Sequence, residues 1–201
     1  MTAPVVGFYF DYASPFAYLG STQLAGISAR SGATIDLRPM LLGAVFKAIG
    51  TPMVPLFAMP AAKQRMMSFE LHRWADHFGV PFRFASRFPQ NTVKALRMTL
   101  GAPIDKRAAL VAALFRTIWV GDGDLASDAD LRVVASGVGL DPEEALGWTC
   151  SEPMKSALRE ATDAAVRAGV FGAPTFEVGG ELYWGQDRIE LVEAALQQQL
   201  R

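Results

Sequence analysis

The stretch VVGFYFDYASPFAYLG, residues 5–20, decides the fold. Its first part, residues 5–10, is rich in aromatic and β-branched side chains, which is typical of a short buried strand. Ser14 and Pro15 follow, a favoured N-cap residue and a favoured first residue of a helix. The stretch therefore predicts a strand that leads through a short loop into a helix, which we expect to run from Pro15 to about Arg30.

A second strand is expected at ATIDLRP, residues 33–39, directly after this helix. Ile35 and Leu37 alternate there with polar neighbours, and alternation of this kind is typical of a half-buried strand. Gly32 is suited to end the helix, and Pro39 to end the strand. Strand, crossover helix and second strand together predict a β-α-β opening with parallel strands.

The sequence changes character after a loop rich in Pro and Met at residues 51–60, because helical periodicity then continues up to residue 168. Ser127 has Asp130 three residues later and Asp141 has Glu144 three residues later, so both are expected N-caps. Helices are predicted at residues 63–78, 92–100 and 105–120, after Ser127, after Asp141, and at 151–168 with Gly169 as the residue that follows the end.

The C-terminal part returns to strands. TFEV (175–178), Gly179-Gly180 and ELYW (181–184) predict a hairpin with a two-residue turn. A terminal amphipathic helix is expected at 187–200, with an apolar stripe that includes Leu200.

The element order is therefore β-α-β, a block of helices, then β-β-α. This order predicts an α/β protein with a thioredoxin-like fold that carries a large all-helical insertion. We expect residues 1–42 and 169–201 to form a discontinuous thioredoxin-like domain and residues 43–168 to form the helical insertion domain.

Composition excludes several classes of function. The 201 residues include 19 Lys and Arg against 20 Asp and Glu, and this balance argues against a surface for nucleic acid or an anionic membrane, which would need a basic excess. The N-terminus lacks the pattern of a secretory signal, and Asp11, Ser14 and Pro15 interrupt its apolar stretch, so no membrane span is expected there.

Cysteine and histidine usage argues against disulfide and metal chemistry. Cys150 is the only cysteine, so neither an intramolecular disulfide nor a zinc cluster can form, and a cytoplasmic location is expected. His72 and His77 are i and i+5 on a predicted helix and do not share a face as an i, i+4 ligand pair would. We expect no metal.

Several motifs, taken together and in order, resemble those of a known family. They are FYFDYASPFAYLG (8–20), LLGAVFKAIG (41–50), RWADHFGVP (73–81), FPQNTVKALR (88–97), VFGAPTF (170–176) and YWGQDR (183–188). The chain resembles the 2-hydroxychromene-2-carboxylate isomerases and the kappa-class glutathione transferases, which are DsbA-like members of the thioredoxin superfamily. The resemblance implies glutathione as cofactor and a homodimer.

The resemblance gives Ser14 the central role. Ser14 stands where a thioredoxin has the first cysteine of its CxxC motif, and in this family its hydroxyl is expected to face the glutathione sulfur and favour the thiolate. The residues alone indicate only a helix cap. Pro174 is expected to be cis, so that the backbone of Ala173 pairs with the cysteinyl part of glutathione. The alternative is a simple strand start at a sheet edge.

The segment Trp184-Gly185-Gln186-Asp187 is expected to receive the γ-glutamyl end of glutathione, with Asp187 facing its ammonium group. On its own, Asp187 is an acid at a favourable helix start. Gln186 replaces the Asn or Ser of some relatives, and Thr51 stands where relatives often have Asn.

The helical insertion is expected to form the substrate wall. Lys63 is a candidate for binding glutathione and Lys47 for binding a substrate carboxylate, and a solvated surface lysine is the alternative for both. Asn91 is expected to orient a substrate oxygen or to cap the helix that begins at Thr92. A further group of side chains is expected in the core rather than at the substrate: Phe8, Phe16, Trp74 and Phe88.

The resemblance implies a glutathione-dependent isomerase that interconverts 2-hydroxychromene-2-carboxylate and trans-o-hydroxybenzylidenepyruvate, an aromatic keto acid, in aromatic catabolism. A thiolate that adds to the conjugated carbon makes the double bond single, allows rotation and then leaves. Two alternatives stay open. One is a kappa-type glutathione transferase that conjugates electrophiles, and the other is a non-catalytic module that binds thiol peptides.

Overall fold

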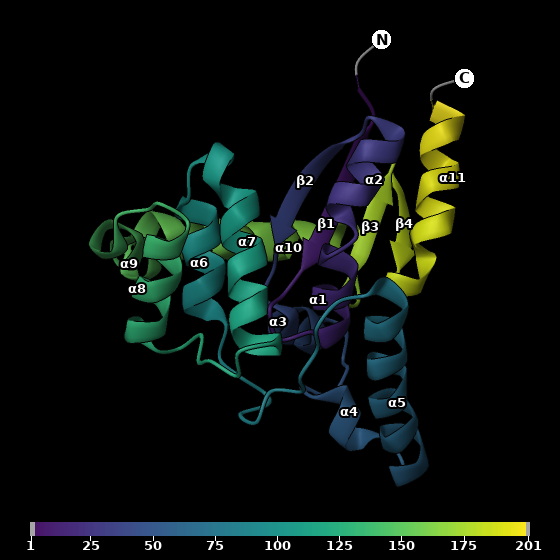
Figure 1. The fold of residues 1–201 in the computed structure, drawn as a ribbon, viewed down its shortest axis with the longest axis horizontal. Helices are drawn as coiled ribbons and strands as arrows, with labels where there is room; N and C mark the ends of the chain where they lie inside the picture. Colours follow the sequence, from purple (N-terminus) through teal and green to yellow (C-terminus); the bar gives the residue numbers. More distant parts are fainter. Residues whose placement is uncertain (1–2, 200–201) are drawn as a thin grey trace.

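The computed structural model describes residues 3–199, which are built around a four-stranded mixed sheet (Figure 1). The strand order is β2-β1-β3-β4. β1 pairs parallel with β2 and antiparallel with β3, and β3 pairs antiparallel with β4. The strands are β1 (Val5–Phe10), β2 (Thr34–Pro39), β3 (Thr175–Val178) and β4 (Glu181–Trp184). The expected β-α-β and β-β-α halves thus meet in one sheet, and the thioredoxin-like fold is confirmed.

The first helix is divided, contrary to the expectation of one helix from Pro15 to Arg30. It consists of α1 (Pro15–Ser21) and α2 (Leu24–Ser31). At the break, the hydroxyls of Ser21 and Thr22 donate to the carbonyl oxygens of Tyr18 and Leu19. Because these side chains take up carbonyls three residues back, they compete with continued helical hydrogen bonding. α2 ends as expected at Gly32, whose φ of +69° lies in the left-handed region.

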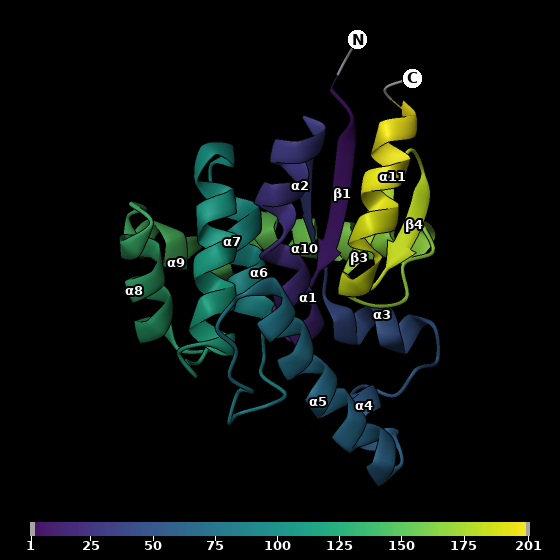
Figure 2. The ribbon, with the colours of Figure 1, turned by 45° about the vertical axis from the view of Figure 1, so that its right-hand side comes forward.

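Helices cover both faces of the sheet, because side chains of β1 alternate in direction. Phe8 and Phe10 pack on one face with α1, α2 and α11 (Ile189–Gln199). Tyr9 points to the other face, where it meets α3 (Leu42–Ala48) and α10 (Glu152–Arg167). α10 passes behind the sheet in both views (Figures 1 and 2).

The inserted helices follow the predicted order. They are α4 (Pro55–Ala58), α5 (Ala61–Phe78), α6 (Val93–Gly101), α7 (Ile104–Trp119), α8 (Asp128–Gly137) and α9 (Pro142–Cys150). Both expected caps are confirmed, because Ser127 accepts from the N–H of Asp130 and Asp141 accepts from that of Glu144. α10 ends before Gly169, as expected.

One further expectation about this region was wrong, because α4 lies inside the expected loop at 51–60. α3 lies in a segment for which no element was predicted. Pro55 at the first position of α4 explains how so short a helix starts there. Cys150, directly before the helix predicted at 151–168, is the last residue of α9. α4 and the adjoining end of α5 project beyond the sheet at the end where α1 begins (Figure 2).

One apolar core runs from the sheet into the insertion. The ring of Phe115 in α7 lies 5.6 Å from that of Phe10, 4.8 Å from that of Tyr12 and 6.2 Å from that of Tyr18, measured between centroids. The two expected domains therefore share buried side chains at this junction, and their division remains a prediction.

The C-terminal hairpin and helix are close to expectation. Gly179 and Gly180 both have positive φ, 61° and 87°, as a two-residue turn between twisted strands requires. A single turn of 3-10 helix at 186–188 precedes α11, which therefore begins at Ile189 rather than at 187. Leu200 lies outside the described residues. Within residues 3–199 no helix is both long and apolar enough to cross a membrane.

Candidate functional site

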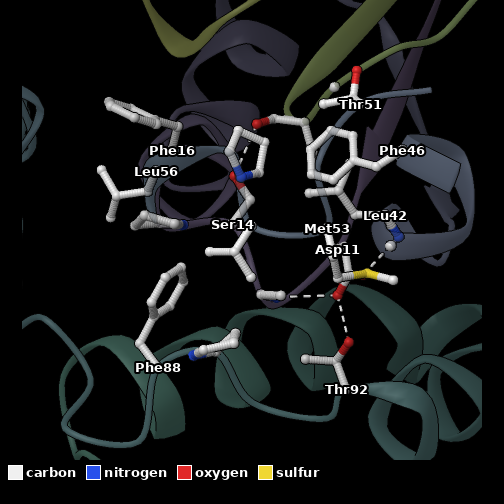
Figure 3. A pocket seen from close by; sticks show the side chains of 18 of the residues that line it. Asp11, Ser14, Phe16, Leu42, Phe46, Thr51, Met53, Leu56, Phe88 and Thr92 are labelled. Atoms are coloured by element: carbon white, nitrogen blue, oxygen red, sulfur yellow. Dashed lines mark hydrogen bonds between the residues drawn. The ribbon is translucent and has the colours of Figure 1, made fainter. Parts of the chain in front are cut away.

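A cavity of about 850 Å³ lies where the loop after β1 meets α3, α4, α5 and the segment before α6. Its lining is mainly apolar, and Figure 3 shows the rings of Phe16, Phe46 and Phe88 around the side chain of Ser14. The wall from α3 to α5 adds flexible side chains: Leu42, Met53, Leu56, Met59 and Met67. A volume of this size and character suits a small organic ligand.

Ser14 is 6% exposed, and its hydroxyl is fixed by two hydrogen bonds, one as acceptor and one as donor. The oxygen accepts a hydrogen bond of 3.1 Å from the N–H of Ala17, so Ser14 is the N-cap of α1, as the residues alone indicate. The hydroxyl donates 2.8 Å to the carbonyl oxygen of Ala173, which is 159 residues away in the chain. Ser14 and Ala173, the two groups expected to meet the cysteinyl part of glutathione, are thus side by side at the cavity.

Pro174 follows a cis peptide bond, as the resemblance implies. The alternative of an edge strand is wrong, because β3 lies between β1 and β4. The carbonyl oxygen of Pro174 accepts a 3.0 Å hydrogen bond from the N–H of Gly185. This bond holds the segment after β4 beside the segment before β3.

Trp184 stands at the mouth of the cavity, with 54% of its surface exposed. Its ring packs on Phe171, with 4.9 Å between centroids, and lies against the backbone of Gly172. A Cβ at position 172 would lie 2.5 Å from the indole nitrogen, so only glycine allows this approach. The loop before β3 and the end of β4 therefore build one side of the mouth.

The other residues expected to bind glutathione lie just beyond the cavity. Gln186 is the buried first residue of the 3-10 turn, whereas Asp187 is exposed, and neither of them lines the cavity. The Asp187 carboxylate lies against Gly185, whose φ of +116° favours glycine. The same carboxylate lies 3.3 Å from the guanidinium of Arg188. The expected cofactor site is therefore divided between the cavity and the adjoining surface of this turn.

Of the three residues of the insertion that were expected to contact ligands, only one lines the cavity. Asn91 lines it, and its side-chain oxygen accepts 3.1 Å from the N–H of Val93, the first residue of α6, while Thr92 and not Asn91 occupies the N-cap position. Lys47 and Lys63 are exposed and do not line the cavity. They do adjoin it in sequence, because the neighbouring residues Phe46 and Gln64 both belong to its lining.

The expectation for the aromatic residues holds for two of the four. Phe8 is fully buried in the core and Trp74 packs against it. Phe16 and Phe88, also expected in the core, line the cavity as well. Phe16 is the second residue of α1 and Phe88 lies in the segment before α6, and each ring packs partly against the core and partly against the cavity.

Asp11 is a cavity residue that the sequence reasoning missed. It is 1% exposed and its carboxylate accepts hydrogen bonds from the N–H groups of Ala13 (3.0 Å) and Leu42 (2.8 Å). The hydroxyl of Thr92 donates a third, of 2.6 Å (Figure 3). Burial raises the pKa of Asp11, and the three donors act against that rise. The available signal was a charged residue directly after a buried aromatic strand and three residues before Ser14.

Comparison with known proteins places the chain in a family. Residues 5–197 match the family described as a DSBA-like thioredoxin domain. The chain belongs to this DsbA-like family. A 2-hydroxychromene-2-carboxylate isomerase from Sphingobium xenophagum is 31% identical over 95% of this chain and 97% of its own length. Glutathione S-transferase kappa 1 from Rattus norvegicus is 29% identical over 94% of this chain and 88% of its own length.

Solved structures of DsbA-like proteins agree with the sequence relatives. A 2-hydroxychromene-2-carboxylate isomerase superposes with a TM-score of 0.87 and 28% identity, covering 98% of this chain and 96% of that one. The resemblance expected from the sequence motifs is thereby confirmed, including both of its branches.

Proposed function

We propose that this DsbA-like protein is a glutathione-dependent isomerase of the 2-hydroxychromene-2-carboxylate type. The observation that carries the proposal is the meeting of Ser14 and the Ala173 backbone at the edge of an apolar cavity large enough for an aromatic ligand. Support also comes from relatives with that name, which match nearly the whole chain.

When bound, glutathione supplies a thiolate that adds reversibly to the conjugated carbon of the keto acid, so that the former double bond can rotate. The protein's part is to hold and ionise the thiol. In the proposed complex the Ser14 hydroxyl turns from the Ala173 carbonyl to the sulfur and stabilises its charge as a donor. The Ala173 backbone groups then pair with the cysteinyl residue, and Gln186 and Asp187 receive the γ-glutamyl end.

The substrate is proposed to lie against the apolar walls. Its aromatic ring contacts Phe16 and Phe88, and its carboxylate meets the flexible ammonium groups of Lys47 or Lys63 outside the cavity. Lysine suits this role because a long stem carries its charge several ångströms from the backbone.

A kappa-type glutathione transferase is the second candidate, and one observation favours it. Among residues 3–199, those that line the cavity include no Lys, Arg or His. A neutral electrophile needs no cation inside the cavity, whereas a keto acid depends on the lysines at its margin. Both reactions need the same thiolate.

The direct test is to assay one preparation with both substrate types. With glutathione present, the isomerase proposal predicts interconversion of 2-hydroxychromene-2-carboxylate and trans-o-hydroxybenzylidenepyruvate without consumption of glutathione. The transferase alternative predicts loss of free thiol with an aryl halide and no isomerisation. The absence of both reactions would contradict both proposals.

The remaining expectations belong to the same proposal. We propose a homodimer that works in the reducing cytoplasm, where its single cysteine and its thiol cofactor stay reduced. Light scattering coupled to size-exclusion chromatography tests the dimer, and a mass of one chain, 21.7 kDa, would contradict it.

A further inference from the structure

The cavity has a charged group at its inner end and exposed side chains at its mouth. Asp11 is 1% exposed, whereas Met53 and Trp184 are 64% and 54% exposed. Within the described part of the chain, Asp11 is the only charged residue that lines the cavity. A ligand that enters therefore moves from a solvated mouth toward a buried carboxylate.

The hydrogen bonds of Asp11 are those of an ionised carboxylate. All three contacts are donated to it, by the N–H groups of Ala13 and Leu42 and by the hydroxyl of Thr92. No Lys, Arg or His of residues 3–199 forms a salt bridge with it. These donors are neutral, so the ionised Asp11 keeps its net negative charge at the inner end of the cavity.

We propose that Asp11 determines specificity by excluding anionic groups from the inner end of the cavity, so that a substrate enters with its uncharged end first. Like charges that share a poorly hydrated cavity repel strongly. Asp11 also retains acceptor capacity, since a carboxylate offers about four lone-pair sites. A neutral hydroxyl is therefore accepted where a carboxylate is rejected.

The repulsion by Asp11 sets the orientation of the keto-acid substrate in the cavity, an application that rests on the proposed function. A keto acid would place its aromatic ring toward Asp11 and its carboxylate at the mouth. That direction agrees with Lys47 and Lys63, which are exposed beside the lining residues Phe46 and Gln64. The repulsion itself needs neither glutathione nor catalysis, so it can be measured apart from the proposed function.

Two fluorescent ligands of one scaffold test the proposal without glutathione. N-phenyl-1-naphthylamine is neutral, and 8-anilinonaphthalene-1-sulfonate adds one negative charge. Each is titrated at neutral pH and low salt, in competition with the other, so that only their shared site is compared. We expect the wild-type protein to bind the neutral probe at least about tenfold more tightly, and Asp11→Asn to reduce this ratio to about twofold.

Thr92→Val is the matched control, because it removes one hydrogen bond of Asp11 and keeps the carboxylate. We expect it to retain the wild-type ratio. Equal binding of the two probes by the wild-type protein would overturn the proposal, and this comparison needs no variant to fold. A ratio that falls equally in Thr92→Val and Asp11→Asn would also overturn it, because loosened packing would then be the cause.

Discussion

The hydroxyl of Ser14 donates a hydrogen bond of 2.8 Å to the carbonyl oxygen of Ala173. The bond joins the start of α1 to the segment before β3, so it links the two halves of the thioredoxin-like sheet at the cavity. It also occupies both groups that are expected to meet a cysteinyl ligand. A cysteinyl ligand would therefore replace the hydrogen bond between Ser14 and Ala173 by hydrogen bonds of its own, and without it these two polar groups satisfy each other.

Ser14 and Ser127 form a matched pair of helix caps. Each accepts a hydrogen bond from the N–H three residues on, but only Ser14 lies at the cavity. Replacing either by Ala should lower the free energy of unfolding by about 1 kcal/mol, measured by urea denaturation. Only Ser14→Ala should also reduce turnover, by about 10²–10³-fold, as the loss of one charge-stabilising donor does. Equal loss of activity in both variants would reduce Ser14 to a structural cap.

Lys47→Ala and Lys63→Ala separate the two candidate reactions. If the substrate carboxylate binds a lysine at the mouth, at least one variant should raise KM for the keto acid by about tenfold with little change in kcat, because only binding is lost. An aryl halide should show no such effect. Lys94→Ala is the control, since that ammonium lies 2.6 Å from Asp128 and does not line the cavity. An unchanged KM in both variants would exclude these lysines as the carboxylate site.

Asp11 should make the free energy of unfolding depend on pH. Burial raises its pKa in the folded protein above the ordinary value of 3.8, so the folded state binds this proton more tightly than the unfolded state. The stability of the wild type relative to Asp11→Asn should therefore fall as pH rises from 3.8 through the raised pKa. Urea unfolding of both proteins across this range checks the slope. A difference that is flat or rises with pH would contradict the shift.

Phe115→Ala tests whether the helical insertion unfolds together with the sheet. The Phe115 ring is fully buried against Phe10 and Tyr12, so its truncation should cost about 3–5 kcal/mol. Because these rings come from both expected domains, unfolding should remain a single transition when followed by circular dichroism and by tryptophan fluorescence. Two separate transitions would show that residues 43–168 form an independent unit.

Much of the fold could be predicted because its elements carry local signals. The strand at 5–10, the Ser-Pro helix start and the Gly-Gly hairpin turn depend on neighbours within a few residues. The caps at Ser127 and Asp141 are equally local. The break after Ser21 could not be predicted in this way, since side-chain hydroxyls compete there with an otherwise continuous helical pattern.

The site was harder to predict than the fold, since it depends on distant contacts. Ser14 and Ala173 were found through the family motifs, but the bond between them joins residues 159 positions apart. Phe16 and Phe88 have the composition of core residues, and only the surrounding helices leave one side of each ring open to the cavity. Asp11 meets Leu42 and Thr92 through folding alone.

The central claim is that this DsbA-like protein ionises the thiol of glutathione through Ser14. The most direct measurement is the ultraviolet difference spectrum of the protein titrated with glutathione near neutral pH, with Ser14→Ala measured in parallel. The account predicts a thiolate band that grows to saturation in the wild type and is lost in the variant. Binding of glutathione without that band would indicate a thiol-peptide-binding module, and an absence of binding would contradict the cofactor assignment.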